Sequence, residues 1–198
     1  MAIPVRFHFD PLCPWAWQAS KWIREVEKVR GVDIEWRLFS LALINEDGDD
    51  PLADAHARGG VALRTLVLVR REGGNDAVGR VYEALGTRVH EVSSQDLDHV
   101  AIRSALEAEG FDPSMLDRAL TDNSTAEDVR TEHDAAVSEV GAFGVPTIVL
   151  GSVGIFGPVI AKAPTGEAAG ELWDHVEWLI RQDGFFELKR ERDLKPGG

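Results

Sequence analysis

Residues 9–17 read F-D-P-L-C-P-W-A-W, and this stretch joins two different hydrophobic patterns. Across residues 3–9, apolar and polar side chains alternate, which is the period of a half-buried β-strand. Across residues 14–29, apolar side chains recur mainly at spacings of three and four, which indicates the buried stripe of an amphipathic helix. Cys13 therefore stands where a strand passes into a helix, and Gly31 provides a stop for that helix.

The rest of the chain supplies a second strand, a helical block, a hairpin and a final helix. We expect strands at 32–41, 145–151 and 153–159, and helices at 55–72, 75–91, 97–109, 114–121, 124–140 and 166–181. This order predicts an α/β protein with a thioredoxin-like fold, β-α-β and then β-β-α, and an inserted all-helical subdomain. We assign residues 1–50 and 142–198 to the thioredoxin-like domain and residues 51–141 to the insertion. The charged tail from residue 189 is expected to fray.

Composition excludes several classes of protein. The chain has 198 residues, with 21 Lys and Arg against 34 Asp and Glu, and a formal net charge of −13. This balance repels nucleic-acid phosphates and anionic lipid surfaces, and no basic run offsets it. No apolar stretch approaches the ~20 residues that a membrane-spanning helix needs. The first residues lack the charged and apolar regions of a secretion signal, so we expect a cytoplasmic protein.

Cys13 is the single cysteine of the chain, so no internal disulfide can form. A thiol at the start of a helix faces unpaired backbone N–H groups and the positive end of the helix dipole, which lower its pKa. Pro14 suits the first helical position because it has no N–H to leave unpaired. Trp15 and Trp17 offer apolar or stacking surface near the sulfur. The alternative is a buried, inert cysteine.

Val145-Pro146 opens the third expected strand, where a proline cannot donate to a central ladder. In a thioredoxin-like layout this proline is expected to be cis and to lie against the active-site sulfur. The backbone of Val145 is then placed to pair with a bound thiol compound. The alternative is an ordinary trans proline before an edge strand.

Several motifs together are similar to one family. They are F-D-P-L-C-P-W-A-W at 9–17, S-L-A-L-I-N-E at 40–46, G-V-P-T-I at 144–148, F-G-P-V at 156–159, G-E-A-A-G-E-L-W-D at 166–174 and F-F-E-L-K-R at 185–190. The chain resembles the mycothiol-dependent nitroreductases, a family in the DsbA-like branch of the thioredoxin superfamily. The resemblance runs nearly end to end. It implies a cytoplasmic reductase that draws electrons from the low-molecular-weight thiol mycothiol.

The resemblance also implies roles for single residues. Cys13 corresponds to the nucleophile, Trp15 to the tryptophan beside it, Asn45 to a polar residue facing the substrate cleft, and Pro146 to the cis-proline. Ala16 departs from the pattern, because better-known relatives have a second cysteine there that resolves a mixed disulfide. With alanine at this position, a mixed disulfide between the nucleophile and mycothiol is expected to be released by a second mycothiol thiol.

Two other functions stay open from the sequence. One is a thiol transferase or isomerase like the kappa-class glutathione transferases, in which the residue at position 13 activates a bound thiol without forming a disulfide. The other is a thiol-binding or chaperone module without redox activity. The six histidines show no metal-binding spacing, so we expect no metal, and the glycines at 151, 154 and 157 do not form a dinucleotide motif. We expect no tightly bound cofactor, with mycothiol and a small oxidised compound as partners.

Overall fold

The computed structural model describes residues 3–45, 52, 58–92 and 96–197. Its sheet has four strands in the order β2-β1-β3-β4, namely β1 (Ile3–Phe9), β2 (Val32–Leu38), β3 (Thr147–Leu150) and β4 (Val153–Phe156). β1 and β2 are parallel, while β3 is antiparallel to both β1 and β4. The predicted α/β, thioredoxin-like fold class is confirmed. The predicted domain boundary between residues 50 and 51 lies outside the described residues.

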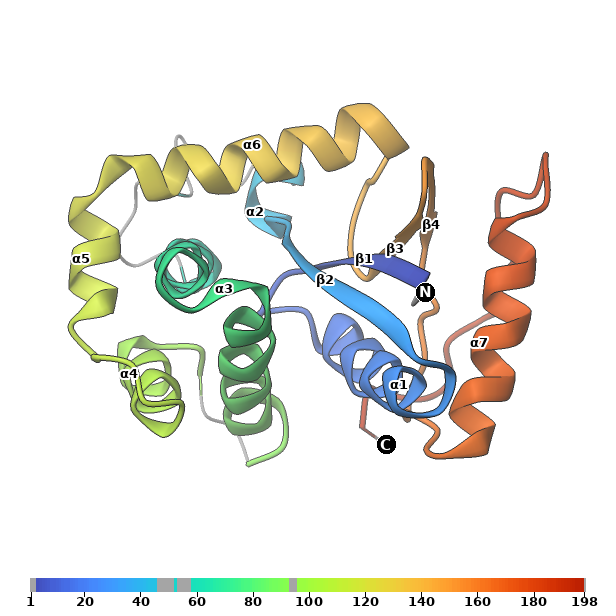
Figure 1. The fold of residues 1–198 in the computed structure, drawn as a ribbon, viewed down its shortest axis with the longest axis horizontal. Helices are drawn as coiled ribbons and strands as arrows, with labels where there is room; N and C mark the ends of the chain where they lie inside the picture. The colour runs from blue at the N-terminus through green and yellow to red at the C-terminus, as the bar shows by residue number, and fades with distance from the viewer. Residues whose placement is uncertain (1–2, 46–51, 53–57, 93–95, 198) are drawn as a thin grey trace.

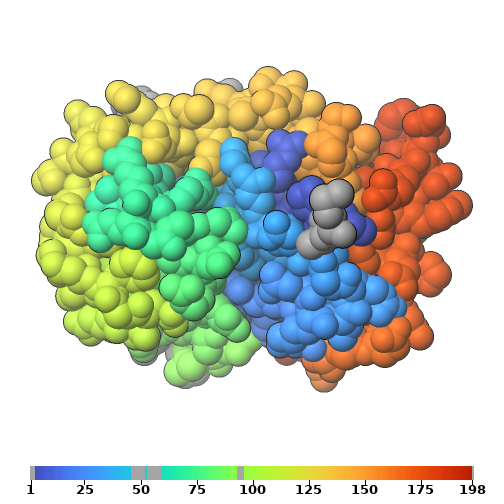
Figure 2. Space-filling view, viewed as in Figure 1, coloured from blue at the N-terminus to red at the C-terminus, as the bar shows by residue number. Residues whose placement is uncertain are grey.

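The helices surround this sheet. They are α1 (Pro14–Arg30), α2 (Leu41–Ile44), α3 (Arg58–His90), α4 (His99–Ala108), α5 (Met115–Thr121), α6 (Asn123–Val140) and α7 (Glu167–Ile180). α1 lies on one side of β2 and α6 runs along the other (Figure 1). Figure 2 shows helices α3 to α5 gathered on one side of β2 and α7 on the other. No described helix is long and apolar enough to cross a membrane.

Helix α1 begins and ends as the sequence predicts. Cys13 is its N-cap, Pro14 occupies the first helical position, and Gly31 closes it with a positive φ of 65°. Trp22 on the buried face of α1 packs against Trp173 of α7, and its indole N–H donates to the carbonyl of Ala169 at 3.0 Å. This packing against α7 holds α1, and with it Cys13, in place.

An aromatic cluster fixes the face of the sheet that α1 and α3 cover. Phe7 and Phe9 of β1 each form a T-shaped ring contact with Trp36 on β2, and Phe9 stacks on Tyr82 of α3 with ring centroids 3.9 Å apart. All four side chains are buried. Because side chains alternate along a strand, the residues of β1 next to Phe7 and Phe9, such as His8, face the opposite side of the sheet.

The break predicted at Gly73-Gly74, between helices 55–72 and 75–91, is found at Gly74, whose φ of 77° and ψ of −173° are not helical. The structure differs from the predicted boundaries in two places. The predicted second strand ends at Leu38, because residues 41–44 form the short helix α2. β4 ends at Phe156, where Gly157-Pro158 follows and proline has no N–H for the ladder.

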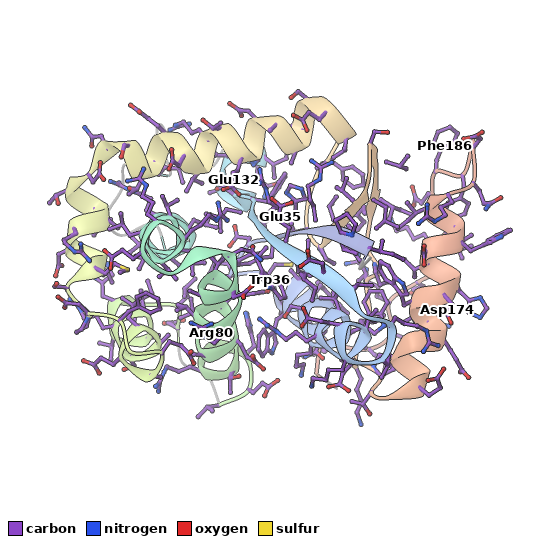
Figure 3. The ribbon with its side chains drawn as sticks, viewed as in Figure 1. Glu35, Trp36, Arg80, Glu132, Asp174 and Phe186 are labelled. Carbon is purple, nitrogen blue, oxygen red and sulfur yellow. The ribbon has the colours of Figure 1, made fainter. Side chains whose placement is uncertain are left out.

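The opposite face of the sheet carries charged groups. Glu132 of α6, labelled in Figure 3, lies between α6 and β2 and accepts the backbone N–H of Leu38 at 2.7 Å. Glu132 also forms ion pairs with Arg37 of β2 and Arg70 of α3. His8 of β1 lies on this face and is 2% exposed. Neither ring nitrogen of His8 has a hydrogen-bond partner among the described residues.

His8 makes the stability of the fold depend on pH. Burial, followed by the nearby charges of Arg37, Arg6 and His133, lowers the pKa of His8 to about 3. In the unfolded chain histidine titrates near 6.5. Below that pH, His8 therefore binds a proton in the unfolded state but stays neutral in the folded state. The free energy of unfolding is therefore expected to fall as the pH drops, by about 3 kcal/mol from pH 7 to pH 4 through this one group.

We expect His8→Leu to remove that part of the acid sensitivity without loss of stability at pH 7, because it replaces two unpaired buried nitrogens with apolar surface. Urea unfolding at pH 7 and pH 4 measures both effects. His175→Gln, on the exposed face of α7, is the matched control and should leave the pH dependence unchanged. An unaltered pH dependence in His8→Leu would contradict the assignment.

Candidate active site

Cys13 lies at the centre of the candidate site. Its Sγ accepts the backbone N–H of Ala16 at 3.4 Å, as an N-cap side chain does. The same sulfur donates to the carbonyl oxygen of Val145 at 3.5 Å. The residue is 7% exposed. The thiol therefore bridges the first turn of α1 and the segment that leads into β3.

Pairing of β1 with β3 brings these distant segments together. His8 lies opposite Thr147 in the antiparallel register, so the end of β1 meets the start of β3. The Val145–Pro146 peptide bond is cis, and the carbonyl of Pro146 accepts the N–H of Gly157 at 2.8 Å. The structure thus places Cys13, Pro14, Val145 and Pro146, all predicted from the sequence, at one end of the sheet.

Burial affects the pKa of the Cys13 thiol more than its position at the start of a helix does. Burial raises the pKa of Cys13 above its ordinary value, and the Asp10 carboxylate acts in the same direction. Backbone N–H groups of Ala16 and Trp15, and the charge of Arg192, lower it by less. The sequence predicts a lowered pKa from the helix start alone. In the folded chain, exclusion of solvent has the larger effect, so the pKa of Cys13 is raised instead.

Asp10 is a residue that sequence reasoning missed. It is 1% exposed, and its two carboxylate oxygens accept the backbone N–H groups of Leu12 and Leu41 at 2.9 and 2.8 Å. Burial raises its pKa to about 6. Asp10 therefore ties the loop before Cys13 to the start of α2. Its position in a Pro-containing turn after an apolar strand was the available signal, because such an aspartate commonly bonds backbone nearby.

Trp15, whose backbone N–H acts on the pKa of Cys13, is half-buried and has an unexpected neighbour. The guanidinium carbon of Arg192 lies 5.3 Å from the centre of its ring. Arg192 belongs to the segment after α7 that the sequence predicts to fray, yet the backbone N–H of Gly197 in that segment donates to the carbonyl of Ala161 at 2.7 Å. The segment is mostly exposed, but it is joined to the body of the protein at Gly197 and meets Trp15 at Arg192.

The structure places Trp17, which the sequence predicts to bind substrate, in the core. Trp17 is 1% exposed, and its indole N–H donates to Glu91 at 3.1 Å. Its ring packs against Tyr82 and lies so close to Gly86 that no Cβ would fit between them. Trp17 points into the core because it falls on the buried stripe of α1, whereas Trp15 lies near the edge of that stripe.

Asn45 stands apart from the sulfur. It is exposed at the end of α2, and its amide N–H donates to the carbonyl of Leu41 at 2.8 Å. α2 begins at Leu41, whose backbone N–H is held by Asp10. Asn45 is thus linked to the loop before Cys13 through α2, without a described contact to the sulfur itself. Among the described residues, no group of three or more potential ligands could hold a metal ion.

The raised thiol pKa is testable because Cys13 is the single cysteine, so alkylation reports on it alone. Only the thiolate reacts, and we expect the rate of reaction with iodoacetamide to keep increasing above pH 9. The rate is measured from pH 7 to 10.5. The same chain in urea is the control and should show the ordinary midpoint of about 8.5. A midpoint at or below that of the unfolded chain would contradict the burial argument.

Solved structures share the fold. A 2-hydroxychromene-2-carboxylate isomerase has a TM-score of 0.64 and 17% identity, over 90% of this chain and 97% of its own. A probable DsbA oxidoreductase from Streptomyces coelicolor has a TM-score of 0.60 and 18% identity, over 96% and 94%. The cytosolic disulfide reductase DsbM from Pseudomonas aeruginosa has a TM-score of 0.56 and 17% identity, over 90% and 99%. These similarities show a DsbA-like, thioredoxin-type fold.

Sequence comparison is more specific. The protein Rv2286c of Mycobacterium tuberculosis is 37% identical over 190 residues, which cover 95% of this chain and 82% of the relative. The Rv2466c-like family, described as "Mycothiol-dependent nitroreductase Rv2466c", matches residues 12–190. That range includes the strand-to-helix turn, the helical block and both strands of the hairpin. The chain therefore belongs to the Rv2466c-like family of mycothiol-dependent nitroreductases.

Proposed function

We propose that this protein is a mycothiol-dependent thiol oxidoreductase that reduces mixed disulfides, or small oxidised or nitroaromatic compounds. The observation that carries the proposal is the position of Cys13 Sγ, at the start of α1 and 3.5 Å from the carbonyl of Val145 before cis Pro146. Family membership supports mycothiol as the cosubstrate. A cytoplasmic location fits, because thiols there are kept reduced.

Thiol–disulfide exchange at Cys13 needs two steps. In the first, the Cys13 thiolate attacks the mycothiol sulfur of a mixed disulfide, forms a Cys13–mycothiol disulfide and releases the other thiolate, which takes up a proton. In the second, a mycothiol thiolate attacks the mycothiol sulfur of that adduct, forms mycothiol disulfide and frees the Cys13 thiolate. The mixed disulfide gains two electrons, and in sum it and one mycothiol become the released thiol and mycothiol disulfide.

Nitroaromatic reduction has the same electron balance. Reduction of a nitro group to a nitroso group takes two electrons and two protons and releases one water. The Cys13 thiol and one mycothiol thiol supply both as they join in a Cys13–mycothiol disulfide, and a second mycothiol then frees Cys13 as mycothiol disulfide forms. Trp15, half-buried and two residues after Cys13, offers a ring face for an aromatic substrate. Asn45, exposed at the end of α2, is the polar residue we assign to the rim of the site.

Ala16 decides where the second thiol comes from. Its backbone N–H binds Cys13 Sγ, and its side chain is fully buried. A cysteine at this position, three residues on along the same helical face, could attack an adduct on Cys13. Alanine cannot, so the adduct persists until a second mycothiol arrives.

A second candidate is a thiol transferase or isomerase like the kappa-class enzymes. Two observations favour it: Cys13 is held as a buried thiol with a raised pKa, and the chain has no second cysteine. The fold is also similar to that of a 2-hydroxychromene-2-carboxylate isomerase. In this candidate, groups around residue 13 orient a bound thiol, and no disulfide forms.

Incubation with mycothiol disulfide separates the candidates. We expect intact mass spectrometry to show one mycothiol adduct on the wild-type chain, removed by excess mycothiol, and none on Cys13→Ser. Ala16→Cys is the matched variant, because it should convert the adduct to an internal disulfide with the loss of two hydrogens and the release of mycothiol. Adduct formation should be faster at pH 9 than at pH 7, since the thiolate reacts.

Turnover completes the test. We expect mycothiol-dependent reduction of a nitroaromatic dye by the wild-type protein and its loss in Cys13→Ser. Failure of Cys13 to form an adduct even at pH 9 would overturn the oxidoreductase proposal. Thiol addition or isomerisation that survives Cys13→Ser would establish the transferase instead. A protein without either activity that retains a thiol compound or a client protein would be a binding module.

A further inference from the structure

We propose that Arg192 is a specificity-determining residue that attracts an anionic substituent of the oxidised substrate to Cys13. The inference rests on the proposed function, in that Cys13 must react with a small molecule. It concerns the segment after α7, and Arg192 lies beyond residues 12–190, the range that matches the family. The class of substrate it selects is a small oxidised compound that carries a carboxylate.

The segment that carries Arg192 has a defined position. The chain leaves α7 and returns so that its C-terminus lies beside α1 (Figure 1). The N–H of Gly197 donates to the carbonyl of Ala161 at 2.7 Å, and a Cβ on Gly197 would lie 3.5 Å from the side-chain nitrogen of Gln18 on α1. These contacts bring the segment to the same helix that begins at Cys13.

Arg192 reaches the candidate site with guanidinium N–H groups that are available to bind a ligand. Its guanidinium carbon lies 5.3 Å from the ring centre of Trp15, which is two residues after Cys13. Such a contact holds a guanidinium through the ring face and leaves N–H groups at its edge. Arg192 is exposed, and it forms no ion pair with any residue that the structure describes. A planar carboxylate accepts two parallel N–H bonds from such a fork.

The charges around the sulfur explain why this cation matters. The whole chain carries a net charge of −13, which repels anionic compounds. Asp10 adds a negative charge at the sulfur, and Arg192 is the positive group that opposes it there. Arg192 therefore lowers the repulsion that an anionic substrate meets at Cys13, and its guanidinium can pair with the substrate carboxylate. A neutral substrate of the same shape does not depend on that charge.

Alkylation of Cys13 tests the inference without mycothiol. Iodoacetate is anionic and iodoacetamide is neutral, and both react with the same thiolate of the single cysteine. Their rate ratio therefore cancels any change in the thiol pKa. We expect Arg192→Gln to lower the ratio of iodoacetate to iodoacetamide rates by about two- to tenfold, the range for one charge across a partly solvated site. Arg192→Lys should keep most of the wild-type ratio.

Arg190→Gln is the matched control, because it removes the same charge from an exposed position two residues away. Its rate ratio should equal that of the wild type within about 1.5-fold, since Arg190 makes no ring contact with Trp15 in the described part of the chain and its exposed charge is screened. The wild-type ratio should also fall as salt is added. A ratio unchanged in Arg192→Gln, or lowered equally in Arg190→Gln, would overturn the assignment to Arg192.

A pair of substrates extends the test to turnover. With mycothiol, Arg192→Gln should lower kcat/KM for 4-nitrobenzoate several-fold more than for 4-nitrobenzamide. Absence of turnover with both compounds in the wild type would count against the proposed function, while the alkylation ratio would still decide the role of Arg192. Equal losses for the two substrates would show a structural effect of the substitution and overturn the inference.

Discussion

The antiparallel pairing of β1 with β3 is the constraint on which the candidate site depends. Antiparallel strands run in opposite directions, so the residues that follow β1 lie beside those that precede β3. This is why Cys13 and Val145, which are 132 residues apart, share a hydrogen bond. The register is fixed by the aromatic face of β1, because a slip of one residue would turn Phe7 and Phe9 away from Tyr82 and Trp36.

Two effects compete at the thiol, and their magnitudes decide the outcome. A helix start stabilises a negative charge by about 0.3–1 kcal/mol, which is less than one pKa unit. Burial of an ionisable group raises or lowers its pKa by up to about 3–5 units. Cys13 is almost fully buried, so its resting form is the protonated thiol. Oxidation by peroxides requires the thiolate, so this form protects a cysteine that has no partner within the chain.

Sequence reasoning predicts the parts of the site that depend on local chemistry. The change of hydrophobic period at residue 13, the proline after it and the Val-Pro pair are all visible in the sequence, and the structure brings them together. It predicts less well what depends on tertiary packing. Trp17 is buried by Tyr82 and Gly86 from a distant helix. Docking of the last segment depends on single backbone contacts, which leave no pattern in a charged sequence.

A buried thiol, a buried acid and an exposed arginine form one electrostatic unit. Asp10 holds the loop before Cys13 and the start of α2 through two backbone N–H groups, and its charge opposes formation of the thiolate. Removal of that charge would also remove the acceptor that organises the loop. Asp10 is therefore needed for its hydrogen bonds, and Arg192 offsets part of its charge at the sulfur from the surface. Ligands can pair with a cation on the surface, and salt can screen it, whereas a buried cation is shielded from both. The reactivity of Cys13 thus depends on the charge of the compound that approaches it and on the salt concentration.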